Sequence, residues 1–64
     1  MKLITTALDR IPKTERTILT LYFYEELTLR QIAEMLQLHE TRISQLKSQA
    51  ILRLRTFLRS RWPT

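Results

Sequence analysis

The chain contains no cysteine and no glycine, and only two prolines, among its 64 residues. Without cysteine, neither a disulfide framework nor a thiolate metal site can form, and a reducing, cytoplasmic setting fits this composition. Without glycine or asparagine, the chain lacks the residues that tight turns between β-strands need where φ is positive. We therefore expect an all-α fold.

Catalytic signatures are lacking as well. There is no glycine-rich phosphate loop and no nucleophile–base pair, and the carboxylates are scattered over the expected helix faces. His39 is the only histidine, so we interpret it as an ordinary turn residue rather than as a metal ligand. The sequence predicts no enzyme activity, no cofactor, no metal site and no small-molecule substrate.

Membrane signals are missing too. No apolar run approaches the roughly 18 residues of a membrane-spanning helix, and the first residues show no signal-peptide pattern. A chain of this length forms at most one small domain, which buries only about 60% of its unfolded surface. We expect a soluble intracellular domain whose modest stability a partner can supplement.

Positive charge is concentrated in the last third of the chain. Residues 1–40 carry five basic and six acidic side chains, whereas residues 41–64 carry six basic side chains and no acidic one. The net charge is therefore −1 in the first part and +6 in the second. A polyanion such as DNA is the natural partner of such a segment, although a solvated helix face would look similar.

Apolar periodicity divides the chain into four helices. The first covers residues 3–10 and the second residues 12–24, with Pro12 in its first turn, where a missing N–H is tolerated. We expect the second helix to be the most buried element, with its aromatic residues in the core rather than on a base-stacking surface. Its apolar residues are Ile18, Leu19, Leu21, Tyr22 and Phe23.

The third and fourth helices follow each other closely. Thr28 and Gln31 match a capping box, in which the threonine oxygen accepts a backbone N–H and the glutamine reaches back. The third helix then covers residues 29–36, residues 37–39 form a turn, and the fourth helix covers residues 40–58. One face of the third helix is apolar and is made of Leu29, Ile32, Ala33 and Leu36.

The fourth helix has two contrasting faces. At 100° per residue, one side forms an apolar stripe of Ile43, Leu46, Ala50, Leu54 and Phe57. Thr41, Gln45 and Ser48 lie near the opposite pole, and the outer face becomes cationic toward the C-terminus. A helix in the DNA major groove uses its first turns to read base edges and later basic residues to contact phosphates. Thr28 and Arg30 could clamp a phosphate through N–H groups and charge.

This arrangement predicts a helix-turn-helix over about residues 28–58 with a long C-terminal recognition helix. Three alternatives remain open. The domain could be a protein-interaction module, which the exposed position expected for Leu52 favours mildly. It could be an independent transcriptional regulator, which would usually need a dimer to read two half-sites. The segment "RLRTFLRSRW" could also lie on an anionic membrane surface, although Phe57 belongs to the apolar stripe.

The segment "IPKTERTILTLYFYEELTLRQIAEMLQLHETRISQLKSQAILRLR" resembles region 4 of bacterial sigma factors of the sigma-70 superfamily. The resemblance covers about residues 3–58, and its landmarks are Pro12 followed by Glu15-Arg16, "YEELTLRQIAEML" and "TRISQLKSQAILRLR". The run "RISQLKSQA" is most similar to the flagellar, sigma-28-type class. Primary sigma factors usually carry arginine where Ser44 stands and an acidic residue where Lys47 stands.

The resemblance implies a function that periodicity alone could not show. Region 4 docks on the flap of the RNA polymerase β subunit, which would grip the early helices and the end of the long one, and it recognises the promoter −35 element. An anti-sigma factor is an alternative partner. The base-reading positions carry over to Glu40, Thr41, Arg42, Ser44 and Gln45. The DNA-backbone positions carry over to Thr28, Arg30, Lys47, Gln49 and Arg53.

One position departs from the family pattern. His39 stands where family members usually carry glycine, serine or threonine, which are better N-caps than an imidazole. The fourth helix could therefore start differently, or Thr41 could share the capping. Because sigma factors are several times longer, we expect residues 1–64 to be an excised C-terminal region 4 domain. Its expected location is the bacterial cytoplasm, in association with the nucleoid.

Overall fold

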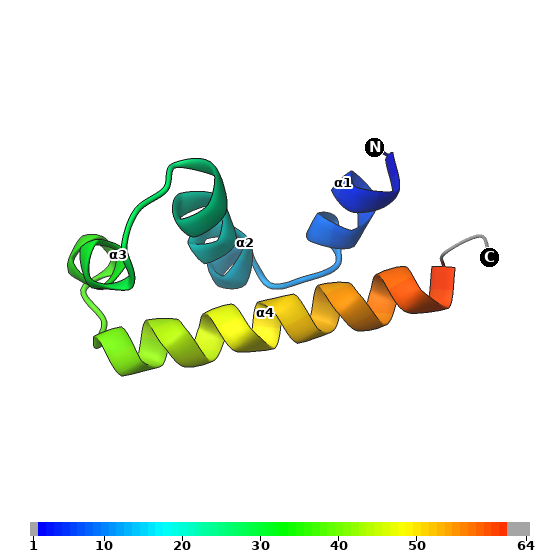
Figure 1. Cartoon of the computed structure of the whole chain (residues 1–64). Coiled ribbons are helices and arrows are strands. Elements are labelled where there is room, and N and C mark those ends of the chain that lie inside the picture. The colour runs from blue at the N-terminus through cyan, green and yellow to red at the C-terminus, as the bar shows by residue number, and fades with distance from the viewer. Residues whose placement is uncertain (1, 62–64) are drawn as a thin grey trace.

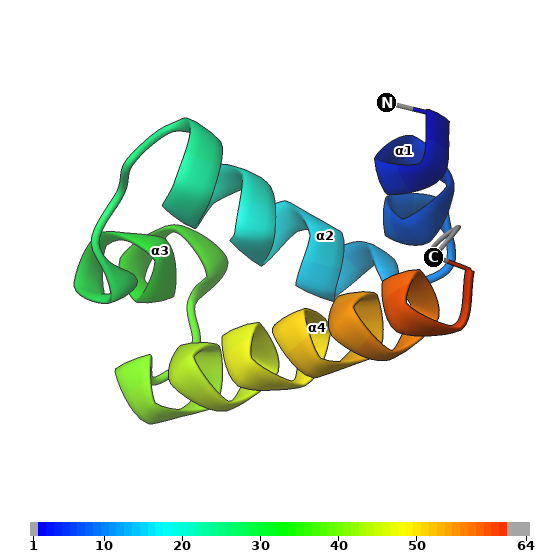
Figure 2. The same cartoon turned by 45° about the vertical axis from the view of Figure 1, so that its right-hand side comes forward.

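The computed structural model describes the backbone of residues 2–61 and the side chains of residues 6–61. The described backbone contains helices joined by short connections and no strands (Figure 1). Its elements are α1 (Lys2–Asp9), α2 (Lys13–Leu19), the π-helix η1 (Thr20–Tyr24), α3 (Leu29–Leu36) and α4 (Glu40–Arg61). α4 forms a long rod along one side, and α3, α2 and α1 lie against it in that order from its N-terminal end (Figure 2).

Two small apolar clusters hold the short helices on α4. The cluster near the N-terminal end of α4 is built around Ile18, Ile32 and Ile43, which come from α2, α3 and α4 and are all fully buried. The second cluster joins Ile11, Leu19 and Ala50. The apolar faces predicted for the third and fourth helices are therefore confirmed, because three isoleucines from three helices meet where periodicity placed them.

The second helix differs from the prediction in two ways. Pro12 is its N-cap, with φ −56° and ψ 148°, so the helix starts one residue later than expected. From Thr20 the chain continues as a π-helix, and the Glu25 N–H donates to the Thr20 carbonyl five residues back, at 3.0 Å. The wider turn changes the direction of the side chains that follow.

One prediction about the core is wrong, and it concerns a residue of the π-helix. Phe23 was expected in the core but is 59% exposed, and its neighbour Tyr24 is 81% exposed. Leu21 and Tyr22 are only half-buried and pack against the first cluster. The helical period of 3.6 residues does not hold across η1, so side chains after Thr20 point in other directions than an α-helix would give them.

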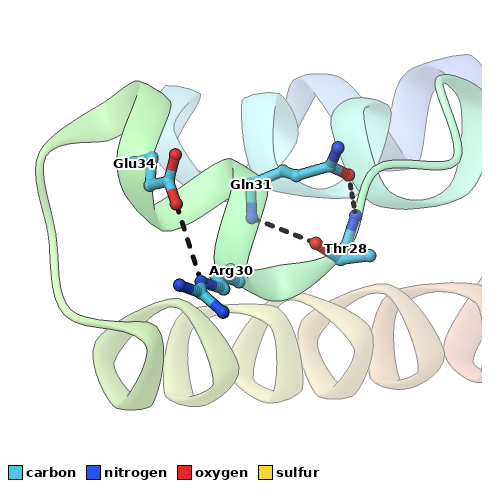
Figure 3. Close-up of polar contacts among 4 residues, drawn as sticks. All are labelled: Thr28, Arg30, Gln31 and Glu34. Atoms are coloured by element: carbon cyan, nitrogen blue, oxygen red, sulfur yellow. Dashed lines mark hydrogen bonds and ion pairs between the residues drawn. The ribbon is translucent and has the colours of Figure 1, made fainter.

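The predicted capping box at the start of α3 is confirmed. The Thr28 Oγ1 accepts the Gln31 N–H at 3.1 Å, and the Gln31 Oε1 accepts the Thr28 N–H at 2.8 Å (Figure 3). These two bonds satisfy helix-start donors that have no partner within the helix. They fix the point at which the chain enters α3.

The turn after α3 forms without glycine. Gln37 adopts the left-handed conformation, with φ 57° and ψ 44°, and the Leu38 N–H donates to the Ala33 carbonyl at 3.0 Å. This is a Schellman-type ending, which usually carries glycine at the left-handed position. Glu26, in the connection between η1 and α3, also has a positive φ, at 58°. The sharp turn between α3 and α4 is therefore made at a conformational cost.

An ion pair joins α2 to α4 at a distance of 38 residues in sequence. The Glu15 side chain is only 4% exposed, and the Arg53 Nε lies 3.1 Å from its Oε1 and 3.3 Å from its Oε2. A carboxylate removed from water in this way needs a cationic partner. Arg53 therefore contributes to the packing of α2 on α4.

Candidate nucleic-acid interface

The burial of α4 separates the two faces that the sequence predicted. Ile43, Leu46 and Ala50 are buried, whereas Thr41 and Gln45 are exposed. Since side chains four residues apart share a face and those two apart do not, the buried stripe turns Thr41 and Gln45 outward. The described outer surface of the first turns of α4 is polar.

Four of the five predicted base-reading residues line one hollow. Its volume is about 630 Å³, and Leu29 from the start of α3 forms part of its wall. The predicted residues in its lining are Glu40, Thr41, Ser44 and Gln45, together with Gln49 from the backbone-contacting set. Arg42 is exposed but does not line this hollow. The hollow presents hydroxyl, amide and carboxylate groups, which can donate to and accept from base edges.

Two of the predicted backbone-contacting residues line a second hollow beside the first. Thr28 and Arg30 border a space of about 620 Å³, which shares Leu29 and Glu40 with the first hollow. The Thr28 N–H and hydroxyl are engaged in the capping box, so a phosphate clamp here cannot use the N–H of Thr28. The Arg30 Nε lies 3.7 Å from the Glu34 Oε1, but both side chains are largely exposed (Figure 3). Such a surface pair is weak, so the arginine can leave it for another anion.

Lys47 and Arg53 have protein contacts in the structure. Lys47 is half-buried, with its Nζ 4.3 Å from the centroid of the Tyr22 ring. Arg53 holds the buried Glu15 carboxylate through its Nε, and its side chain remains 55% exposed. The two cations lie on different sides of α4, because six residues along a helix correspond to about 240° of rotation.

The presence of His39 does not change the predicted start of α4. The helix begins at Glu40, and the exposed His39 accepts the Ile43 N–H on its carbonyl oxygen at 3.1 Å. The acidic Glu40 stands in the first turn, where a negative charge interacts favourably with the helix dipole. The departure from the family pattern therefore does not shift this helix boundary.

Sequence reasoning missed two residues that bear on the interface. Glu15 gave no local signal of its partner on another helix, and no sequence spacing could have supplied one. For Tyr22 the sequence gives only a partial signal. Lys47 follows Ile43 by about one helical turn, so its side chain is expected near the buried edge of α4, where it can meet an aromatic residue of another helix. Which aromatic residue it meets there depends on the π-helix.

Near the C-terminal end of α4, Phe57 is in contact with two arginines. Phe57 is half-buried, and the Cζ atoms of Arg10 and Arg61 lie 5.7 and 5.2 Å from the centroid of its ring. Trp62, which the membrane-surface alternative also invoked, lies outside the described residues. Within residues 2–61 no helix has the length and apolarity needed to cross a membrane. Among the described side chains, no group of three or more potential metal ligands comes together.

A capped short helix, a tight turn and a longer helix with its polar face outward define a helix-turn-helix nucleic-acid-binding domain. The family is more specific than this class. The model of the family described as "Sigma-70, region 4" matches residues 7–56, and the chain belongs to that family.

Relatives of the chain agree with the flagellar class. The chain is 49% identical over 55 residues to RNA polymerase sigma factor FliA of Escherichia coli K12. This match covers 86% of this chain and 23% of that protein. It is 46% identical over 55 residues to FliA of Pseudomonas aeruginosa, covering 86% of this chain and 22% of the relative. It is 35% identical over 51 residues to the RNA polymerase sigma-D factor of Bacillus subtilis, a match that covers 80% of this chain and 20% of the relative. No solved structure matches the chain significantly.

The chain spans less than a quarter of the length of these relatives. Its resemblance to region 4 of the sigma-70 superfamily and to the flagellar, sigma-28-type class is confirmed.

Proposed function

We propose that residues 1–64 are the region 4 domain of a flagellar-type sigma factor, which recognises a promoter −35 element in the bacterial cytoplasm. The observation that carries this proposal is the exposure of Thr41 and Gln45 above a buried stripe on α4. Their hollow lies between the starts of α3 and α4, the position at which a helix-turn-helix meets the major groove. In this proposal Glu40, Thr41, Arg42, Ser44 and Gln45 face base edges.

The charge distribution supports the same proposal. Residues 41–64 carry a net charge of +6, and release of counterions from phosphates supplies much of the affinity for DNA. We assign phosphate contacts to Thr28, Arg30, Lys47, Gln49 and Arg53. These contacts set the register of the helix on the duplex, and the exposed first turns of α4 supply the sequence preference.

Titration of the chain with a −35 duplex and with a scrambled duplex, each at two salt concentrations, tests this proposal. Replacing Gln45 by Ala should weaken binding to the −35 duplex by about fivefold to 150-fold, the range of one lost bidentate base contact, while scrambled duplex binding changes little. Thr56→Ala is the matched control. It alters an exposed residue of the same helix about 16 Å farther along the axis. Equal affinity for both duplexes at both salt concentrations would refute base reading.

A second surface favours a protein partner. An apolar groove of about 920 Å³ lies between α1, the end of the second helix and the C-terminal half of α4. Its walls include Leu8, Leu19, Phe23, Leu54 and Leu58, and Arg55 and Arg59 border it. We propose that an amphipathic helix of the polymerase β flap docks here, because a monomeric domain seldom leaves such an apolar groove uncovered.

Binding of the chain to the isolated β flap tests this second surface. Leu58→Ala should lower flap affinity by about tenfold, as expected for truncation of a well-packed interface residue. Leu52→Ala is the matched control, because Leu52 is 59% exposed and does not line the groove. Both variants should retain binding to the −35 duplex. An anti-sigma factor in the same groove would compete with the flap, and such competition would support the alternative of a protein-bound regulatory state.

A further inference from the structure

Tyr22 makes two contacts that periodicity did not predict. Its ring lies beneath the Lys47 ammonium, with 4.3 Å between the Nζ and the ring centroid. Phe23 meets the same ring edge to face, at 4.8 Å between centroids and with an interplanar angle of 80°. Tyr22 is half-buried against the first apolar cluster, so its ring is a fixed surface on which a cation can rest.

The same ring borders the hollow at the start of α3. Tyr22, Thr28 and Arg30 all line that space, although they come from η1, the connection and α3. Lys47 comes from α4 and leaves it near the buried edge, about one turn after Ile43. Lys47 does not itself line the hollow, so Tyr22 is the residue that contacts both Lys47 and this space.

The electrostatics of the hollow make a positioned cation useful. Glu26 and Glu40 also line it, and their carboxylates repel a phosphate group. Arg30 is exposed, and the nearby Glu34 carboxylate offsets part of its positive charge. A lysine whose ammonium rests on an aromatic ring supplies a second positive charge. The ring restricts the position of that charge, which a free lysine side chain would leave variable.

We propose that Tyr22 is a positioning residue for DNA binding: it holds the Lys47 ammonium beside the α3 hollow, where Lys47 and Arg30 engage phosphates of one DNA strand. This inference rests on the proposed function and deepens it. Tyr22 itself reads no base. Its contribution is to reduce the freedom that Lys47 must lose on binding, and it acts equally on every DNA sequence.

Three variants and one double variant separate positioning from simple packing. Lys47→Ala should weaken −35 and scrambled duplexes alike and reduce the salt slope of binding by about 0.9, the value for one phosphate contact. Tyr22→Leu should weaken both duplexes by about two- to fivefold, the range of an exposed cation–π contact. Tyr22→Phe keeps the ring and should bind as the unmodified chain does. In the Lys47→Ala background, Tyr22→Leu should cause no further loss.

A nuclear magnetic resonance measurement on the unmodified chain tests the contact without any substitution. The ε-methylene protons of Lys47 should be shifted upfield by the ring current of Tyr22, and Tyr22→Phe should retain this shift. A Lys47 signal at its ordinary position overturns the proposal. The same holds if Tyr22→Leu binds DNA as tightly as Tyr22→Phe, or if it weakens binding equally with and without Lys47.

The outcomes also distinguish this proposal from the proposed function. If the unmodified chain binds the −35 and scrambled duplexes equally, base recognition fails, while the positioning of Lys47 is still judged by the variant series on either duplex. If the −35 duplex is preferred but the Tyr22 and Lys47 effects are additive, base recognition stands and the positioning role fails.

Discussion

Removing the cation that faces Glu15 should destabilise the fold more than any other single change to an arginine of α4. The Arg53 Nε lies 3.1 and 3.3 Å from the two carboxylate oxygens, and Glu15 is 3% exposed. At this separation two unit charges attract by about 5 kcal/mol if the effective dielectric constant is about 20. Arg53 is more than half exposed, so solvent screens much of this attraction. We expect Arg53→Ala to lower the free energy of unfolding by about 2 kcal/mol, a typical value for a hydrogen bond to a charged group.

Thermal unfolding followed by circular dichroism measures this effect directly. For a domain of this size, a loss of about 2 kcal/mol lowers the midpoint by roughly 8–16 °C. Arg42→Ala is the matched control, because Arg42 is an exposed arginine of the same helix and has no ion pair among the described side chains. Its free energy of unfolding should change by less than about 0.5 kcal/mol.

A double variant tests the cause as well as the size of the effect. Glu15→Gln removes the buried charge and keeps nearly the same shape, so Arg53→Ala should cost much less in that background. Equal losses for Arg53→Ala and Arg42→Ala, or strict additivity with Glu15→Gln, would show that the pair does not stabilise α2 on α4.

Three further predictions concern stability, and chemical denaturation in urea measures each of them. Thr28→Ala should cost about 1 kcal/mol because the capping box is lost, whereas Thr28→Ser should retain stability; similar losses for both would contradict the capping argument. Gln37→Gly should raise the free energy of unfolding by about 0.5–1 kcal/mol, since glycine adopts the left-handed conformation without strain; a loss of stability would refute this reasoning. Ile43→Val should cost about 0.5–1.5 kcal/mol at a fully buried site, while Leu52→Ala should change little; the reverse order would contradict the assignment of the two faces of α4.

Local features of the fold were predictable because their causes lie within a few residues. The capping box depends on Thr28 and Gln31 alone, and the buried stripe of α4 depends on a period that an unbroken helix keeps. The exposure of Thr41 and Gln45 followed from the burial of Ile43. Much of the candidate interface could therefore be placed on one face before the structure was known.

The features that the sequence could not predict depend on irregular backbone or distant partners. The π-helix at Thr20–Tyr24 alters the period, and Phe23 within it is exposed rather than buried. The contact of Glu15 with Arg53 joins residues that no local pattern relates. Positive φ at Gln37 occurs although glycine and asparagine, which favour it, are absent from the chain, because tertiary packing of α3 and α4 outweighs the local cost.

The straightness of α4 has a consequence for how two partners could be combined. The helix is continuous from Glu40 to Arg61 and carries the polar hollow near one end and the apolar groove near the other. Gln45 and Leu58 are about 20 Å apart along its axis, at 1.5 Å per residue. In the proposed function, the duplex and the docked protein helix would therefore bind at opposite ends of α4. If both proposed contacts are made, one unbroken helix would set the orientation of the duplex relative to the docked protein.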